Sequence, residues 1–230
     1  MSDGDVIREQ IEYYRRRAPE YDDWFFHRCR YDEGDARRAQ WQAEIEAARA
    51  RLRSLGEVDD ALELACGTGL WTGRLLRQAR RLTAVDASPE VIELALERVR
   101  HDPRVVFEVA DLFAYRPVQR YDLVSFTFWL SHVPRERIGG FFDLLRGCLR
   151  PGGRLFAVDQ AETPDKRTSV DGMQERGLAD GSTFRIVKRF YGKAELEALF
   201  AEHGFRAEVT LTPSLWVAVA AEGSVAGVRG

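Results

Sequence analysis

Cysteine is scarce in this chain: Cys29, Cys66 and Cys148 are the only three among 230 residues. They are odd in number, lie far apart in the sequence and contain no CxxC pair. The sequence therefore indicates neither a disulfide framework nor a zinc site. Because such cysteine usage is typical of a reducing compartment, we expect a cytoplasmic protein.

Long apolar runs are also missing. None approaches the roughly 18 residues that are needed to cross a bilayer, and the segment 2–5 (SDGD) is acidic and polar. We therefore expect neither a signal peptide nor a membrane anchor.

The chain has no excess of basic charge, with 34 Lys and Arg against 37 Asp and Glu and a net charge of −3. Because a nucleic-acid surface needs clustered positive charge, we expect no nucleic-acid partner. The composition, 45% hydrophobic and 31% charged, is that of a soluble globular domain. The partner that we expect is a small molecule, and the protein is expected to be a monomer or a homodimer.

Short apolar runs alternate with helical periodicity after residue 60. The pattern predicts helices at 6–19 (ended by Pro19) and 36–54, five strands at 60–65, 81–86, 104–109, 121–127 and 153–159, then a helix at 193–203 and strands at 205–211 and 215–221. Strands that alternate with helices indicate a doubly wound parallel sheet. The connection 212–214 is too short for a crossover, so the last two strands must be antiparallel.

These elements predict one α/β domain with a Rossmann-like, seven-stranded, mostly parallel sheet. Its segments are a helical N-terminal lid or extension (1–55), a nucleotide-binding core (56–160), an insertion after the fifth strand (160–192) and a C-terminal helix with an antiparallel strand pair (193–222). The insertion, rich in charge and glycine, is too long for a simple connection and is expected to cover the substrate. Its end, 182–190, alternates well enough for an extra strand.

The sharpest local signal is the segment 63–71, ELACGTGLW, where the first strand turns into a helix. Glycines at 67 and 69 allow a tight turn and let a ligand lie against bare N–H groups. Asp86 ends the second strand, where a carboxylate can accept hydrogen bonds from both ribose hydroxyls. A dinucleotide fingerprint would need glycine at position 72, which is Thr72, so NAD is disfavoured.

The spacing Glu-x-Ala-x-Gly-x-Gly resembles motif I of the class I S-adenosylmethionine (SAM) dependent methyltransferases, with Ala65 where that family often has a first glycine. Asp86 matches the family's ribose-binding acid, Asp111 the acid that takes the adenine amino group, and residues 148–153 the turn into the fifth strand. The resemblance implies SAM as cofactor, S-adenosylhomocysteine (SAH) as product, and a cofactor site formed by Tyr14, Tyr21, Glu63, Ala65, Cys66, Gly67, Gly69, Trp71, Asp86, Ala87, Ser88, Ala110, Asp111, Leu112, Phe126 and Thr127.

The acceptor is expected beyond the carboxyl end of the fourth strand. His132 is the first candidate for a general base, although a histidine in this loop equally often only bonds to backbone. Asp159 and Glu162 rank second and His27 third. No metal is expected; a magnesium ion of the catechol-methyltransferase type would have to use Asp159 and Asp122.

The N-terminal segment 13–26 is dense in aromatic residues and resembles the lid of small-molecule methyltransferases. We expect residues 1–30 to close over SAM, with Tyr14 and Tyr21 toward the cofactor and Trp24 or Phe25 toward the acceptor. The other interpretation is a helix buried at the sheet edge. Arg15, Arg16 and Arg17 are expected on a solvated face, with one of them a candidate to pair with the SAM carboxylate.

The sequence thus indicates a SAM-dependent methyltransferase that acts on O, N or C of a small, partly aromatic or hydrophobic molecule. Two alternatives stay open: an enzyme that methylates protein or RNA, and a SAM-binding module without catalysis. Against the first, the Asn-Pro-Pro-aromatic tetrad is absent after the fourth strand, where residues 125–128 read SFTF.

Overall fold

A seven-stranded sheet lies at the centre of the molecule, in the order β3-β2-β1-β4-β5-β9-β8. The computed structural model describes residues 3–163 and 172–223. The strands are β1 (Val58–Leu64), β2 (Ala79–Asp86), β3 (Val105–Val109), β4 (Tyr121–Thr127), β5 (Leu149–Gln160), β8 (Phe205–Leu211) and β9 (Leu215–Glu222). Strands β1 to β5 run parallel, and β9 is antiparallel to both β5 and β8. The predicted doubly wound fold with its antiparallel terminal pair is confirmed.

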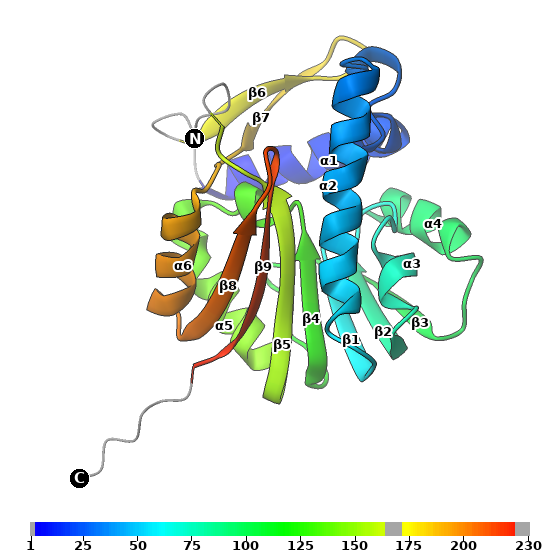
Figure 1. Ribbon diagram of the computed structural model, residues 1–230. Coiled ribbons are helices and arrows are strands. Elements are labelled where there is room, and N and C mark those ends of the chain that lie inside the picture. The colour runs from blue at the N-terminus through cyan, green and yellow to red at the C-terminus, as the bar shows by residue number, and fades with distance from the viewer. Residues whose placement is uncertain (1–2, 164–171, 224–230) are drawn as a thin grey trace.

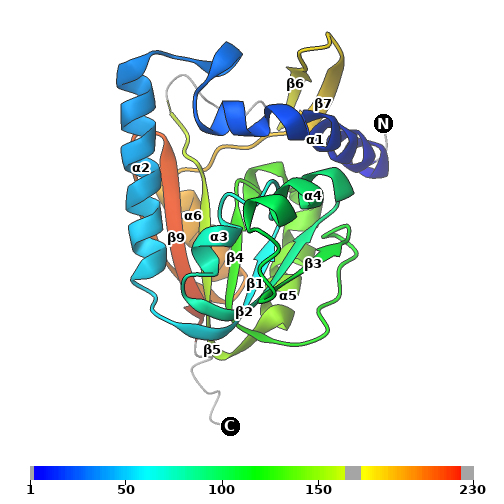
Figure 2. The same cartoon turned by 90° about the vertical axis from the view of Figure 1, so that its right-hand side faces the viewer.

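Helices cover both faces of this sheet (Figures 1 and 2). They are α2 (Asp35–Arg53), α3 (Thr72–Leu75), α4 (Pro89–Arg98), α5 (Ile138–Cys148) and α6 (Lys193–Glu202). The apolar side of α2 packs with the strands in one buried cluster that includes Trp41, Leu52 and Phe156. Helices α5 and α6 pack on the opposite face. In the part of the chain that the structure describes, no helix is both long and apolar enough to cross a membrane.

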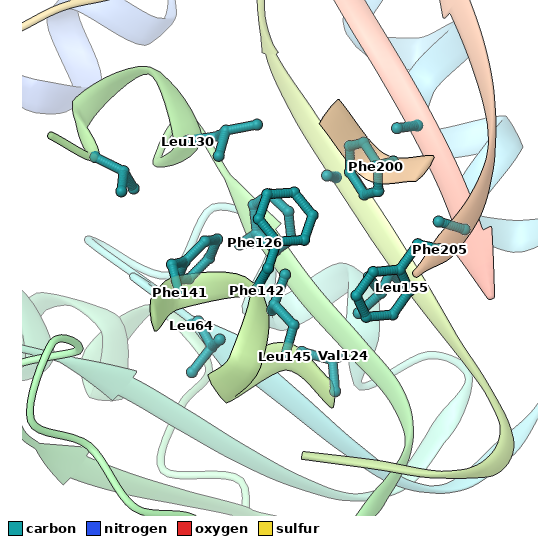
Figure 3. Close-up of a cluster of buried hydrophobic side chains, with 14 of the residues drawn as sticks. Leu64, Val124, Phe126, Leu130, Phe141, Phe142, Leu145, Leu155, Phe200 and Phe205 are labelled. Carbon is teal, nitrogen blue, oxygen red and sulfur yellow. The ribbon is translucent and has the colours of Figure 1, made fainter. Parts of the chain in front are cut away.

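Aromatic rings fill the layer between the sheet and helices α5 and α6 (Figure 3). Phe142 of α5 meets Phe200 of α6 edge to face, with ring centroids 5.2 Å apart. Phe126 of β4 meets Phe141 of α5 in the same way at 5.2 Å. Because large rings bury much apolar area, this layer holds helices α5 and α6 against the sheet.

Helix α1 (Asp3–Phe25) and a two-stranded hairpin lie across the carboxyl edge of the sheet (Figures 1 and 2). The hairpin consists of β6 (Met173–Gly177) paired antiparallel with β7 (Thr183–Val187). The extra strand expected within 182–190 therefore exists, in a small sheet of its own. Residues 164–171 of the expected insertion lie outside the described residues.

The predicted end of the first helix at Pro19 is wrong, since α1 continues through Pro19 to Phe25. An internal proline costs a helix roughly 3 kcal/mol. The following turn is held by packing: Phe25 is buried, and the indole N–H of Trp41 donates to the Phe25 carbonyl oxygen at 2.7 Å. Tertiary contacts of α2 thus outweigh the local signal.

Candidate active site

A cavity of about 620 Å³ lies between α1, the β6–β7 hairpin and the carboxyl edge of the sheet. The turn after β1, the ends of β2 and β4, and the loop that contains the short helix η2 (Leu130–His132) form its floor. Open parallel sheets bind ligands at this edge.

The glycine turn is tied to the end of β2 by Asp86. One carboxylate oxygen accepts from the Gly67 N–H at 2.9 Å, and the other accepts from the Ser88 N–H at 3.0 Å. Ala65 and Gly67 have left-handed φ angles of 54° and 53°. Ala65 therefore takes, at some steric cost, the backbone conformation for which glycine is suited. Because Asp86 is only partly buried and lines the cavity, the remaining lone pairs of its carboxylate are available to a ligand.

The two glycines of the turn face different surroundings. A Cβ on Gly67 would meet no atom within 4 Å, whereas a Cβ on Gly69 would lie 3.0 Å from both Cα and Cβ of Ala95 in α4. Gly67 lines the cavity, and Gly69 is the close contact between turn and helix.

We expect Gly67→Ala to weaken SAM binding at least about tenfold, and Gly69→Ala to lower the melting temperature more than Gly67→Ala does, because both positions have a left-handed φ but only Gly69 is also crowded by Ala95. Isothermal titration and thermal denaturation of both variants test this. Equal melting temperatures for the two variants would contradict the assignment.

The cavity brings together eleven residues that the sequence nominated. They are Tyr14, Tyr21, Ala65, Gly67, Asp86, Ala87, Ser88, Asp111, Leu112, Thr127 and His132. Seven other nominated residues are not on the cavity wall: Glu63, Cys66, Gly69, Trp71, Ala110, Phe126 and Asp159.

Several of these seven support the turn from below. Trp71 packs on Phe156 with ring centroids 5.8 Å apart, and the Ala110 N–H donates to the Asp86 carbonyl oxygen at 2.9 Å. Cys66 is buried, and burial raises the pKa of its thiol, so a thiolate is disfavoured.

Glu63 is a buried acid beneath the glycine turn. Its Oε2 accepts from the Thr72 hydroxyl at 2.6 Å, while Oε1 has no partner in the described part of the chain. Desolvation raises the pKa of Glu63 to about 8. The acid is therefore neutral in the folded protein at pH 7.

This burial predicts a pH-dependent stability. Between pH 4.5 and 8 the folded protein keeps a proton on Glu63 that the unfolded chain releases, so this residue's contribution to stability falls as pH rises. In the wild-type protein, Glu63 alone should lower the free energy of unfolding by about 1.4 kcal/mol for each pH unit in that range. In Glu63→Gln, which cannot ionise, we expect this part of the pH dependence to disappear. Chemical denaturation of both proteins at pH 5.5, 6.5 and 7.5 measures it; parallel curves would contradict it.

His132 reaches the cavity wall, yet both its ring nitrogens are engaged. Nδ1 lies 2.7 Å from the Val187 carbonyl oxygen, and Nε2 lies 2.7 Å from the Tyr14 hydroxyl. A carbonyl only accepts, so Nδ1 carries the proton and Nε2 accepts from Tyr14. Burial, and after it the charge of Lys188, lowers the pKa of His132 well below its ordinary value. The ring is a neutral acceptor that holds Tyr14 in place.

Asp159 is fully buried behind the cavity wall. It accepts from the Ser131 N–H and hydroxyl, each at 3.0 Å, and from the Gln160 N–H at 2.7 Å. Lys188 Nζ lies 3.5 Å from the same carboxylate and donates to the Ser131 hydroxyl at 2.8 Å. The carboxylate therefore positions Lys188 and the loop before His132.

The other base candidates lie away from the cavity wall. His27 packs against Trp41, with ring centroids 5.0 Å apart, and the Glu162 N–H donates to the Tyr191 carbonyl oxygen at 3.4 Å.

The two carboxylates considered for a magnesium ion lie far from each other. Asp122 pairs with Arg150 at 2.9 Å near the start of β4, whereas Asp159 lies near the end of β5. Asp122 and Asp159 are thus at opposite edges of the sheet and cannot share a metal ion.

The expected lid corresponds to α1. The two aromatic residues of α1 that were expected to face the acceptor, Trp24 and Phe25, point in different directions. Trp24 lines the cavity and meets Phe128 edge to face at 5.5 Å. Phe25 turns away into the apolar cluster beneath α2. Gln10 joins α1 to the hairpin and the loop, since its amide donates to the His132 carbonyl and accepts from the Val187 N–H, each at 3.0 Å.

Three basic side chains on the cavity wall were the main omission of the sequence-based site: Lys188 and Arg176 from the hairpin segment, and Arg30 from the N-terminal segment. The expected solvated face is wrong for Arg17, which is 8% exposed and lines the cavity because it packs under aromatic rings of α1. A signal for Lys188 did exist. Phe184, Ile186 and Lys188 are spaced by two in the alternating run, and all three are buried.

Known proteins match this chain over its core and over its whole length. A family model described as a methyltransferase domain matches residues 61–153. DhpI in complex with SAH is 35% identical, with 97% of this chain and 100% of DhpI covered and a TM-score of 0.82. A complex of DhpI with SAM and HEP gives 34% identity and a TM-score of 0.83, with 96% of this chain and 99% of DhpI covered.

More distant matches agree with the fold. The ubiquinone biosynthesis O-methyltransferase of Xylella fastidiosa (strain 9a5c) is 36% identical over 100 residues, which are 41% of this chain and 39% of that protein. The chain spans half or less of the length of the curated relatives that it matches. The N-methyltransferase NodS of Bradyrhizobium japonicum WM9, bound to SAH, shares the fold at 19% identity and a TM-score of 0.66, with 92% of this chain and 97% of NodS covered.

The chain belongs to the class I SAM-dependent methyltransferases, as its likeness to DhpI over the full length shows. It is an enzyme, and SAM is its methyl donor. The residues present fit this donor: open space faces Gly67, and the Asp86 carboxylate stands beside that space. When bound, SAM supplies a methyl group on a positively charged sulfur.

Proposed function

We propose that this enzyme methylates an oxygen atom of a small molecule that carries an anionic group. Oxygen as the target is supported by the activities of two relatives. They are the ubiquinone biosynthesis O-methyltransferase of Xylella fastidiosa and the malonyl-[acyl-carrier protein] O-methyltransferase 2 of Ilyobacter polytropus.

The observation that carries the anionic acceptor is the pair of cations from the hairpin segment. Lys188 is 4% exposed, and both Lys188 and Arg176 line the cavity. Asp159, 3.5 Å from Lys188 Nζ, balances one of these two positive charges, so one remains in excess on the cavity wall. A bound carboxylate, phosphate or phosphonate would balance it.

The protonation states support an acceptor oxygen that arrives already ionised. His132 is neutral, with both nitrogens engaged, and Asp159 lies behind the wall. An oxyanion needs no base, because its own electron pair forms the new O–CH₃ bond while the C–S pair returns to sulfur and leaves SAH. The residues of the site then have two tasks, to align the oxygen and to exclude water.

The cover over the cavity suits these tasks. The Tyr14 hydroxyl is fixed by His132 at 2.7 Å, and Trp24 closes the wall against Phe128. A small acceptor held under α1 and the hairpin would be shielded from water.

The test is methyl transfer from radiolabelled SAM to matched pairs of compounds. Each pair is one carbon skeleton as a carboxylate, phosphate or phosphonate and as its neutral amide or ester; HEP, which DhpI holds together with SAM, is the first single probe. We expect transfer to anionic members at least about a hundredfold faster than to neutral ones. Equal rates within the pairs, or preferred transfer to amines, would overturn the proposal.

A further inference from the structure

Gln10 is a buried amide at the point where α1, the loop after β4 and the hairpin meet. The residue is 2% exposed. Its amide nitrogen donates to the carbonyl oxygen of His132 in the loop, and its amide oxygen accepts from the N–H of Val187 at the end of β7, each at 3.0 Å. Because a carbonyl only accepts and a backbone N–H only donates, the orientation of this amide is fixed.

These bonds belong to a closed ring of hydrogen bonds between the three segments. Nδ1 of His132 donates to the Val187 carbonyl oxygen at 2.7 Å, and Nε2 accepts from the hydroxyl of Tyr14 at 2.7 Å. Tyr14 lies one turn after Gln10 on the same face of α1. An uncharged amide can donate and accept at once, so this one side chain fixes the end of the hairpin against the loop.

The two residues that Gln10 holds lie next to the cation that we assign to the acceptor. Lys188 directly follows Val187 and lines the cavity. Its ammonium donates to the hydroxyl of Ser131, the residue before His132, at 2.8 Å. A shift of Val187 against His132 would therefore move the Lys188 ammonium relative to the cavity.

Gln10 is separate from the contacts that hold α1 over the expected SAM site. Arg15 pairs with Glu90 at the start of α4 at 3.1 Å. Asp22 accepts from the hydroxyl of Thr68 in the glycine turn at 2.9 Å. Loss of the amide should therefore leave the SAM side of the cavity in place and disturb the side that the hairpin forms.

We propose that Gln10 is a positioning residue for the methyl acceptor, because it sets Lys188 in the cavity wall through its two backbone partners. This inference rests on the function proposed above, in which Lys188 meets the anionic group of the acceptor. Both polar atoms of the amide are engaged, so Gln10 acts through the residues that it holds.

Glu9, the neighbour of Gln10, offers a matched control. Its carboxylate accepts from the N–H of Arg185 at 2.7 Å, on the same edge of β7. In the described part of the chain, Glu9 makes no hydrogen bond to the loop after β4. Glu9→Met therefore loosens the hairpin on α1 but leaves the ring of hydrogen bonds complete.

Kinetics and SAM binding give the first test. We expect Gln10→Met to raise KM for the acceptor about tenfold or more, because two buried backbone groups lose their partner, and to change the SAM dissociation constant less than about twofold. Glu9→Met should change either quantity less than about twofold. Steady-state kinetics with HEP and the anionic members of the matched pairs, and isothermal titration with SAM, give these values.

Lys188 itself gives a second test, which needs no acceptor. The chain has three lysines, so ¹³C-labelled lysine gives few NMR signals. Burial lowers the pKa of Lys188 to about 8, with Asp159 opposing this shift and the charges of Arg176 and Arg17 adding to it. We expect the Lys188 signal to titrate near that pH in the wild type and about one pH unit or more higher in Gln10→Met, where the ammonium gains water.

An unchanged acceptor KM, or an unchanged Lys188 titration, in Gln10→Met would overturn the proposal. Equal weakening of SAM and acceptor binding, or the same effects in Glu9→Met, would make Gln10 a residue that only docks α1. If Gln10→Met does not fold, Gln10→Asn replaces it, because the shorter amide cannot reach both backbone groups; wild-type values in that variant would contradict the proposal. If the wild type methylates no anionic acceptor, the proposed function fails, and the Lys188 titration alone decides whether Gln10 places the ammonium.

Discussion

Asp86→Ala is expected to weaken SAM binding about a hundredfold or more. The carboxylate holds the Gly67 N–H at 2.9 Å and the Ser88 N–H at 3.0 Å, and its remaining lone pairs face the cavity. The variant would lose the two bonds that we expect this carboxylate to make to the ribose hydroxyls, and it would also free the glycine turn that the carboxylate holds. Hydrogen bonds to a charged group contribute roughly 1.5–3 kcal/mol each, so two of them account for this loss.

Isothermal titration with SAM and SAH measures the effect, and thermal denaturation shows whether the sheet remains folded. Asp102→Ala is a suitable control, because Asp102 pairs with Arg104 on the surface, away from the cavity wall. An Asp86→Ala affinity within threefold of the wild type would remove Asp86 from the nucleoside site.

Local spacing was enough to predict the glycine turn and its partner. The left-handed backbone conformation at Gly67 depends on the residue type at that position, and the carboxylate of Asp86 is placed by the end of β2. Such features can be read from short stretches of sequence, because a left-handed φ favours glycine and an acid at the end of the second strand is typical of a ribose-binding site.

Which side chains of these motifs reach the cavity wall could not be predicted in the same way. Phe126 stands next to Thr127 of the cavity wall and Trp71 three positions after Thr68, yet Trp71 packs on Phe156 and Phe126 on Phe141. Along a strand or a tight turn, successive side chains point in opposite directions, so neighbours in a motif need not share a site. A motif therefore identifies a segment, and packing decides which of its side chains reach the ligand.

The part of the cavity where we expect the acceptor is formed by contacts between segments that lie far apart in the chain. Gln10 of α1 bonds to Val187 at the end of β7, and Lys188 reaches Ser131 in the loop after β4. No local pattern records which distant segment will cover the sheet edge. The sequence predicted that the N-terminal segment and the insertion cover this edge, but not which charges they bring.

Lys188→Met is expected to lower kcat/KM for the acceptor about thirtyfold or more, with the SAM dissociation constant changed less than about twofold. Methionine keeps a long, unbranched side chain but removes the cation that faces the cavity, and Asp159 keeps its bonds to Ser131 and Gln160. Loss of one partner from a buried charged pair typically costs 2–5 kcal/mol, about thirtyfold or more.

The pH dependence separates a charge effect from lost packing. Burial lowers the pKa of Lys188 to about 8, so the cation is present below that pH and is lost as pH rises through it. We expect the wild-type KM for the acceptor to rise above pH 8. In Lys188→Arg, whose guanidinium stays charged, KM should remain flat over the same range. Steady-state kinetics from pH 6.5 to 9.5 give both curves, and identical alkaline limbs in the two proteins would show that Lys188 does not bind the acceptor's charge.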